Sequence, residues 1–233
     1  MRLTVRDVAQ LLNVSEKTIY RWVSNGEIPY YRLKEQYRFS KAEILEWATA
    51  KRLPLSEEML APPEEDTAPL PDVSQAIQAG GIFYRVGGND KAAVLKSVVD
   101  ALRLPDDVDR DFLLRILLAR EAQGSTGIGE GIAIPHVRNP IVLAGALPSI
   151  TLSFLERPVD FGAIDGAPVR VLFTIISSTI RMHLHLLSRL AFILHDADCK
   201  AAVLSEASRE DLLAHIVRIE GKLSPAAAGK AEA

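Results

Sequence analysis

The chain contains only one cysteine, Cys199, among its 233 residues. A single thiol cannot form an internal disulfide. A common structural zinc site would need two cysteines with two histidines, so one cysteine excludes it. The longest uncharged run, 139–155, is too short and too polar for a membrane helix. Charged residues at Arg2, Arg6 and Asp7 stand where a signal peptide needs an apolar segment. We therefore expect a cytoplasmic protein with no membrane insertion.

Charge is divided unevenly along the chain. The formal net charge is −3, yet residues 1–52 hold ten basic and six acidic side chains. The stretch 53–75 holds six acidic side chains, no basic one and five prolines, a composition that keeps a chain extended. We predict a first domain over 1–52, a linker over 53–75, a second domain over 76–220 and a flexible tail over 221–233.

The first domain begins with two short helices. Thr4 and Asp7 form the pattern of a capping box ahead of an apolar repeat that runs to Leu12. Ser15 can cap a second helix over 16–24, which Asn25-Gly26 then ends. The first part of the chain therefore predicts a helix–turn–helix.

A hairpin and a third helix follow. The stretch 28–39 alternates loosely and is rich in strand-forming residues, which predicts a hairpin, or wing. Ser40 and Glu43 stand three residues apart before another apolar run, the pattern of a second capping box. We expect a small, mainly α winged-helix domain.

Basic side chains on the second helix and the wing fit a nucleic-acid surface. A helix–turn–helix presents its second helix to the DNA major groove, where Lys and Arg displace counterions and Thr and Arg can reach base edges. The candidate DNA-binding residues are Lys17, Thr18, Arg21, Arg32, Lys34 and Arg38. The alternative is a helical protein-interaction domain whose charges are solvated.

The order and spacing of this region resemble the excisionase/MerR-like winged-helix family. The resemblance is carried by LTVRDVAQLLNVS at 3–15, TIYRW at 18–22, GEIP at 26–29 and YRFS at 37–40. It implies DNA contact through the second helix and the wing. The wing departs from the family, because it has Glu35 where a glycine with extra basic residues is usual. This departure predicts weak or partner-dependent DNA binding.

The second domain alternates helical and strand patterns, which predicts an α/β fold. Apolar residues at helical spacing predict helices over 91–104, 109–123, 182–194 and 206–219, and two apolar runs predict strands over 147–155 and 169–176. A glycine-rich segment over 124–138, which we expect to be irregular, separates the two groups.

The glycine-rich segment contains four glycines in the eight residues 124–131 and ends near His136. Glycines let backbone N–H groups approach a ligand closely. The segment follows a helix and lacks the third glycine of a dinucleotide fingerprint, and it has no Gly-Lys-Ser/Thr of a Walker loop. A structural loop with a surface histidine remains the alternative.

The histidines of this domain are the candidate residues for accepting and binding a phosphoryl group. A neutral imidazole is a good nucleophile near pH 7, and phosphoryl transfer needs mainly positioning and positive charge. His183 and His185 stand at the start of a predicted helix, whose N-terminus attracts anions, and their spacing allows only one of them to face such a site. A His-x-His zinc site is an alternative that lacks an evident third ligand, so we assign no metal and no cofactor.

The segment 80–220 resembles the type 2 enzyme IIA domain of the bacterial phosphotransferase system, closest to its nitrogen-regulatory branch. The resemblance is carried by REAQGSTGIGEGIAIPH at 120–136, with later blocks at 161–176 and 183–194. It implies a mixed central sheet flanked by helices. The implied site residues are His136 as phosphoacceptor, His183 and Arg120 around the phosphoryl group, and Gly127, Gly129 and His185 as support. Val137-Arg138 departs from the small residue usual after the histidine.

Together these resemblances predict a regulator. It would accept a phosphoryl group from an HPr-type phosphocarrier and use the added charge to modulate binding to DNA or a target protein. One alternative is a DNA-binding or adaptor protein that is never phosphorylated. Another is a sugar-transport IIA component that passes phosphate to a IIB protein.

Overall fold

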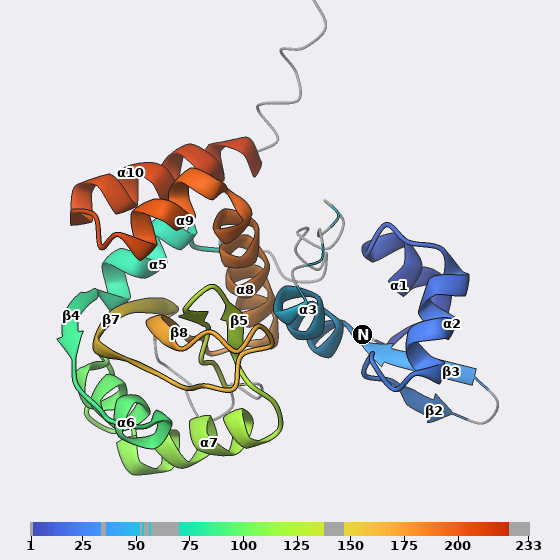
Figure 1. Ribbon diagram of the computed structural model, residues 1–233, viewed down its shortest axis with the longest axis horizontal. Helices are drawn as coiled ribbons and strands as arrows, with labels where there is room; N and C mark the ends of the chain where they lie inside the picture. Colours follow the sequence, from blue (N-terminus) through green and yellow to red (C-terminus); the bar gives the residue numbers. More distant parts are fainter. Residues whose placement is uncertain are drawn as a thin grey trace, which may run out of the picture. The chain divides into compact units, whose positions relative to one another are not determined.

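The computed structural model describes residues 2–33, 36–51, 53, 56, 70–137 and 147–223. The chain divides into two compact units, Met1–Thr67 and Ala68–Ala233 (Figure 1). Most of the predicted linker and the tail from residue 224 lie outside the described residues. The second unit begins earlier than the sequence pattern predicts, because helix α5 starts at Val73.

Among its described residues, the first unit has three helices and a three-stranded antiparallel sheet with the order β1-β3-β2. Its elements are β1 (Arg2–Leu3), α1 (Val5–Leu11), α2 (Glu16–Ser24), β2 (Tyr31–Leu33), β3 (Gln36–Ser40) and α3 (Lys41–Ala50). The predicted order of helix, turn, helix, wing and helix is therefore confirmed.

Side-chain caps fix the starts of the first two helices. Thr4 accepts from the backbone of Asp7, whose carboxylate accepts from the Thr4 backbone N–H at 2.8 Å, so the predicted capping box forms. Ser15 caps α2 by accepting from the backbone of Thr18. Gly26, just beyond α2, has φ +67°, a conformation that glycine adopts without strain. These local signals set the turn between α1 and α2 and the end of α2.

The predicted capping box at α3 is wrong. Ser40 precedes the helix, but its side chain makes no capping hydrogen bond. Ser40 is instead the last residue of β3 and is paired with Arg2 of β1. Glu43 accepts a hydrogen bond from the Tyr31 hydroxyl at 2.7 Å, so its carboxylate ties α3 to the wing.

The second unit has a five-stranded mixed sheet with the order β4-β7-β8-β6-β5. The β4·β7 and β6·β8 pairs are parallel, whereas β7·β8 and β5·β6 are antiparallel. The strands are β4 (Ile82–Val86), β5 (Gly127–Gly129), β6 (Ile132–Ala133), β7 (Ser149–Val159) and β8 (Val169–Ile176). The predicted α/β class and mixed sheet are thus confirmed.

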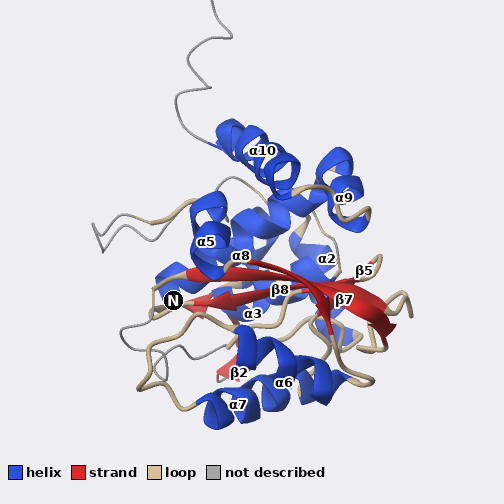
Figure 2. Cartoon of the chain, turned by 90° about the vertical axis from the view of Figure 1, so that its left-hand side faces the viewer, coloured by secondary structure: helices blue, strands red, loops and turns tan. Residues whose placement is uncertain are grey.

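Helices cover both faces of this sheet (Figure 2). The pair α6 and α7 lies on one face, and α5, α8, α9 and α10 lie on the other. Their bounds are α5 (Val73–Gly80), α6 (Lys91–Ala101), α7 (Arg110–Ala122), α8 (Ile180–His195), α9 (Ala197–Leu204) and α10 (Arg209–Glu220), followed by the 3-10 turn Gly221–Leu223. Buried apolar side chains from α6, α7 and the sheet, among them Leu95, Leu113 and Leu172, fill the core between these layers together with Phe161, which follows β7.

Within the described part of the chain, no helix combines the length and apolar character needed to cross a membrane.

Candidate functional site

His136 lies just beyond the short strand β6 and continues its path along β8. It forms a parallel bridge with Ile175, and the Ile175 backbone N–H donates to the Pro135 carbonyl at 3.0 Å. β6 and β8 run parallel, so their carboxyl ends lie at the same edge of the sheet. That edge is where helices following parallel strands present their N-termini, the usual place for a ligand in such sheets.

A hydrogen bond within the segment fixes the imidazole of His136. Its Nδ1 lies 2.7 Å from the carbonyl oxygen of Ile134. A carbonyl oxygen can only accept, so Nδ1 carries the hydrogen and donates. In the neutral ring the lone pair is then on Nε2. Nε2 is therefore the nucleophilic atom of this residue.

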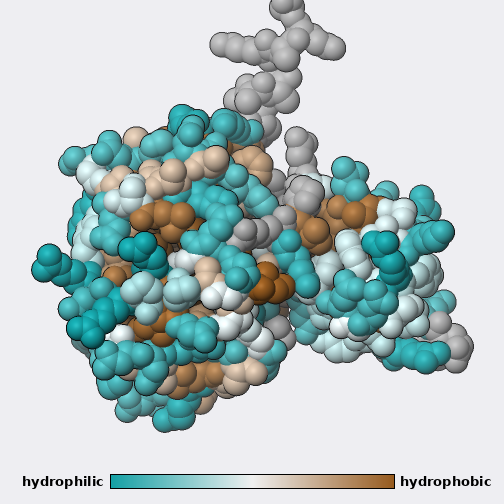
Figure 3. Space-filling view, viewed as in Figure 1, coloured by the Kyte–Doolittle hydropathy of each residue, from teal (hydrophilic) through white to brown (hydrophobic). Residues whose placement is uncertain are grey.

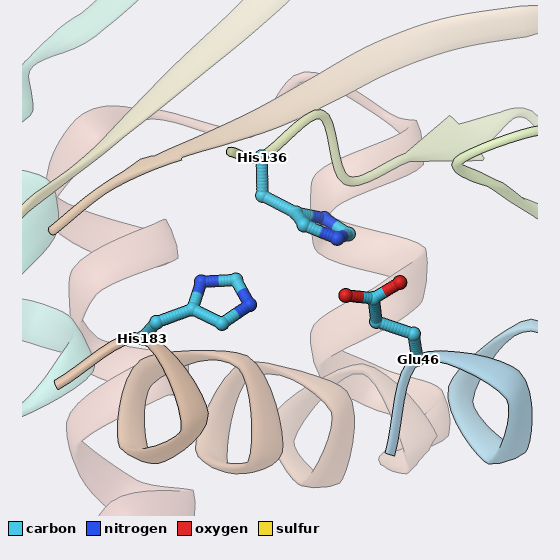
Figure 4. A group of neighbouring side chains, drawn as sticks. All are labelled: Glu46, His136 and His183. Atoms are coloured by element: carbon cyan, nitrogen blue, oxygen red, sulfur yellow. The ribbon is translucent and has the colours of Figure 1, made fainter. Parts of the chain in front are cut away.

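His183 comes to the same place from the first turn of α8. The helix begins after Thr179, which accepts from the Met182 backbone at 3.1 Å, and its first turn contains no acidic residue. The His136 and His183 ring centroids are 5.0 Å apart with a 43° angle between the planes. Figure 4 shows the two rings approaching from the segment after β6 and from α8. Two imidazoles beside a helix N-terminus form a site suited to an anion.

His185 has a different partner, as expected for residues two apart on a helix. Its Nε2 lies 3.1 Å from the Pro71 carbonyl oxygen, at the entry to α5. His183 and His185 therefore do not form a His-x-His pair. Burial lowers the pKa of His185 from 6.5 to about 4, and the nearby Arg189 acts in the same direction. This histidine is neutral at physiological pH and anchors the start of the second unit.

The lowered pKa of His185 predicts that the second unit becomes less stable in acid. The folded-state pKa of His185, about 4, lies below its unfolded value of 6.5, so the unfolded chain binds more protons between these values. The free energy of unfolding should therefore fall as the pH is lowered from 6.5 towards 4. His185→Gln keeps a donor for Pro71 and removes the titration, so its thermal unfolding midpoint should fall less over this range. His215→Gln, which changes a histidine on α10, is the control and should follow the wild type; equal slopes for all three proteins would contradict the assignment.

The glycine-rich segment is a β-hairpin rather than an irregular loop. β5 and β6 pair through Gly127↔Ala133; Gly129 ends β5 and Gly131 lies in the turn, with φ of +86° and +80°. A Cβ on Gly127 would lie 2.8 Å from the Cβ of Ala163, so this strand can approach its neighbour only as glycine. The structure thus gives Gly127 and Gly129 the role of shaping the hairpin that leads to His136.

Two residues at the end of α7 form hydrogen bonds to the segment that leads into this hairpin. The Nη1 of Arg120 donates to the Gly124 carbonyl at 2.9 Å, across the segment that follows the helix. Glu121 is buried, and its carboxylate accepts from the backbone N–H of Thr126 at 3.1 and 3.2 Å. Sequence reasoning missed Glu121, although it stands within the run that carries the resemblance, because nothing in the pattern marks a glutamate near a helix end as buried.

The candidate DNA-binding residues that the structure describes lie on α2 and the wing. Lys17, Arg21 and Arg32 are exposed, and Thr18 and Arg38 are partly buried. Thr18 Oγ1 is 2.9 Å from Ser15 Oγ, within the cap of α2. Lys34 and Glu35, at the tip of the wing, lie outside the described residues. The viewed face of this unit over α2 is mainly hydrophilic in Figure 3.

Both parts of the chain match known protein families. Residues 75–218 match the family described as "Phosphoenolpyruvate-dependent sugar phosphotransferase system, EIIA 2". Residues 2–52 match the family described as "Helix-turn-helix domain". Each matched range lies within one of the two structural units.

Relatives and solved structures match the second unit. The "Nitrogen regulatory protein" of Pseudomonas aeruginosa is 36% identical over 153 residues, which are 64% of this chain and 96% of that protein. The "PTS system fructose-specific EIIABC component" of Bacillus subtilis is 31% identical over 153 residues, 64% of this chain but 24% of that protein. The crystal structure of "Nitrogen Regulatory Protein IIA-Ntr" from Neisseria meningitidis matches with a TM-score of 0.51 and 26% identity, covering 58% of this chain and 92% of that one.

Proposed function

Because this chain belongs to the type 2 EIIA family of the phosphoenolpyruvate-dependent sugar phosphotransferase system, we propose that it accepts a phosphoryl group on His136 from an HPr-type phosphocarrier. We further propose that its phosphorylation state serves regulation through the helix-turn-helix domain. The observation that carries the proposal is the pairing of the His136 ring, held by Nδ1, with the His183 ring 5.0 Å away. The 36% identity to the Pseudomonas aeruginosa nitrogen regulatory protein, over 96% of that protein's length, favours a regulatory role.

The transfer step follows from the tautomer of His136. The Nε2 lone pair attacks phosphorus and forms the N–P bond, while the bond to the carrier breaks and its electron pair leaves with the carrier. The ring keeps the hydrogen on Nδ1 and becomes positively charged, and the Ile134 carbonyl stabilises that charge through the hydrogen bond already present. His183 and the N-terminus of α8 would face the phosphoryl oxygens. Arg120 would add positive charge; His185 takes no part, since its Nε2 already donates to Pro71.

A mass measurement tests this proposal. The full chain is incubated with phosphoenolpyruvate, enzyme I and the carrier, and the intact protein is weighed. A gain of one phosphoryl group supports the proposal, and no gain contradicts it. DNA binding without any phosphorylation would favour the adaptor alternative. Onward transfer from the phosphorylated chain to a IIB protein would favour the transport alternative.

DNA binding by the first unit is the second part of the proposal. Removing Lys17 and Arg21 together should weaken binding of the full chain to a DNA duplex. It should also lower the slope of log affinity against log salt concentration by up to about 2, because each lost phosphate contact lowers it by about 1. Fluorescence anisotropy over a series of salt concentrations measures both quantities.

Lys51→Ala provides the matched control for this pair. Lys51 is exposed and follows α3, so its replacement removes a basic charge outside α2 and the wing. It should leave the salt slope nearly unchanged. If Lys51→Ala weakens binding as much as the double variant does, the affinity reflects net charge rather than a surface on α2.

A further inference from the structure

A chain of hydrogen bonds connects a buried carboxylate to the imidazole of His136. Glu121 accepts from the Thr126 backbone N–H and from Thr126 Oγ1, the latter at 2.5 Å. The Thr126 carbonyl accepts from the backbone N–H of Ile134 at 3.0 Å. The Ile134 carbonyl accepts from Nδ1 of His136 at 2.7 Å. Each link is a direct contact, and the hydrogen bonds lead from Thr126, just before β5, to the segment after β6 that contains His136.

Lys91 also contacts the carboxylate of Glu121. Lys91 Nζ lies 3.2 Å from Glu121 Oε1 and donates to the Phe161 carbonyl at 2.8 Å. Ser125 Oγ donates to the same carbonyl at 2.7 Å and accepts from the Gly127 backbone at 2.9 Å. The hairpin is therefore tied to α7, to α6 and to the segment after β7. Glu121 is 5% exposed, so solvent cannot readily replace these bonds.

We infer that Glu121, acting through Thr126, is a positioning residue for His136. The inference rests on the proposed function, because it concerns how the acceptor ring is held for phosphoryl transfer. The Glu121–Thr126 contact fixes the start of the hairpin, and Thr126 in turn fixes Ile134. Ile134 then holds the hydrogen on Nδ1 and leaves the lone pair on Nε2. Loss of the carboxylate removes the first link and leaves the His136 side chain chemically unchanged but less firmly held.

Glu121→Gln is the test variant, since it keeps the size of the side chain but replaces one acceptor oxygen by a donor. Glu220→Gln is the matched control. Glu220 is also 5% exposed and accepts from the backbone N–H groups of Val73 and Ser74. It lies on α10 and is not one of the residues that connect Glu121 to His136 by hydrogen bonds. Thr126→Val removes the hydroxyl, and Thr126→Ser restores it.

Two readouts are taken on each full-length variant. Nitrogen NMR reports how much of the His136 ring carries its hydrogen on Nδ1, and transfer kinetics report kcat and KM for the phosphocarrier. We expect Glu121→Gln to reduce the Nδ1–H population and to lower kcat by about tenfold to a hundredfold with little change in KM, because small misplacement of a reacting group has effects of this size. Thr126→Val should act in the same direction, and Thr126→Ser should recover most of the loss. Glu220→Gln should leave both readouts as in the wild type.

The inference is overturned if folded Glu121→Gln keeps the wild-type tautomer and kcat, or if Glu220→Gln impairs both equally. If Glu121→Gln does not fold, Thr126→Val and Thr126→Ser decide by the same criteria. If the wild type accepts no phosphoryl group, the proposed function fails. The tautomer measurement then still decides whether Glu121 positions the ring.

Discussion

His136→Gln is expected to abolish phosphoryl uptake by the full chain. Glutamine is close to histidine in size but lacks the imidazole, whose Nδ1 contacts the Ile134 carbonyl at 2.7 Å in the wild type. An amide nitrogen has no available lone pair, so it cannot attack phosphorus. Intact mass after incubation with phosphoenolpyruvate, enzyme I and the carrier should therefore show no gain in this variant.

His215→Gln controls for the loss of a histidine. His215 lies on α10, with Nδ1 3.4 Å from Arg218, and should be dispensable for uptake. Its variant should gain one phosphoryl group at the wild-type rate. A gain that persists in His136→Gln would mean that another residue accepts the group, and the assignment of the acceptor would be wrong.

His183→Ala is expected to have the second largest effect, a fall of about 10²–10³ in kcat, the usual result of removing one donor from a site that stabilises transferring charge. The ring of His183 lies 5.0 Å from that of His136 and follows the capped start of α8, so it can reach oxygens of a group carried by Nε2. His183→Gln should recover part of the loss, because its amide can donate a hydrogen bond. Rapid-quench measurement of the first turnover reports this step.

The neighbouring histidine of α8 provides the comparison. His185→Gln should keep kcat within a small factor of the wild type, since the partner of His185 is the Pro71 carbonyl at 3.1 Å. A loss in His185→Gln as large as that in His183→Ala would show that the effect comes from disturbing α8. The roles assigned to the two residues would then not be separable.

Periodicity and caps predicted the elements whose signals are local. The helix over 16–24 has a serine cap before it and a glycine after it, and the strand over 169–176 is a run of apolar, largely β-branched residues; both have the predicted bounds. The prediction that only one of His183 and His185 faces the site followed from helical geometry. Such features depend on residues close together in the chain, so the sequence alone could reveal them.

Features that depend on distant contacts were not predictable in this way. The hairpin of β5 and β6 is too short and too rich in glycine to show strand periodicity, and it forms because β6 pairs with β8. Strand β4 carries exposed residues in its middle and gives no clean alternation. Glu121 looks like a solvated helix residue until the fold brings Thr126 and Lys91 to it.

We propose that the phosphoryl group is accepted on Nε2 of His136. Phosphorus–nitrogen couplings in the full chain, labelled with ¹⁵N-histidine and phosphorylated through the carrier, test this directly. We expect a single phosphohistidine, at position 136, with phosphorus bonded to Nε2 and hydrogen retained on Nδ1. Phosphorus on Nδ1 of that ring, or on any other histidine, would contradict it.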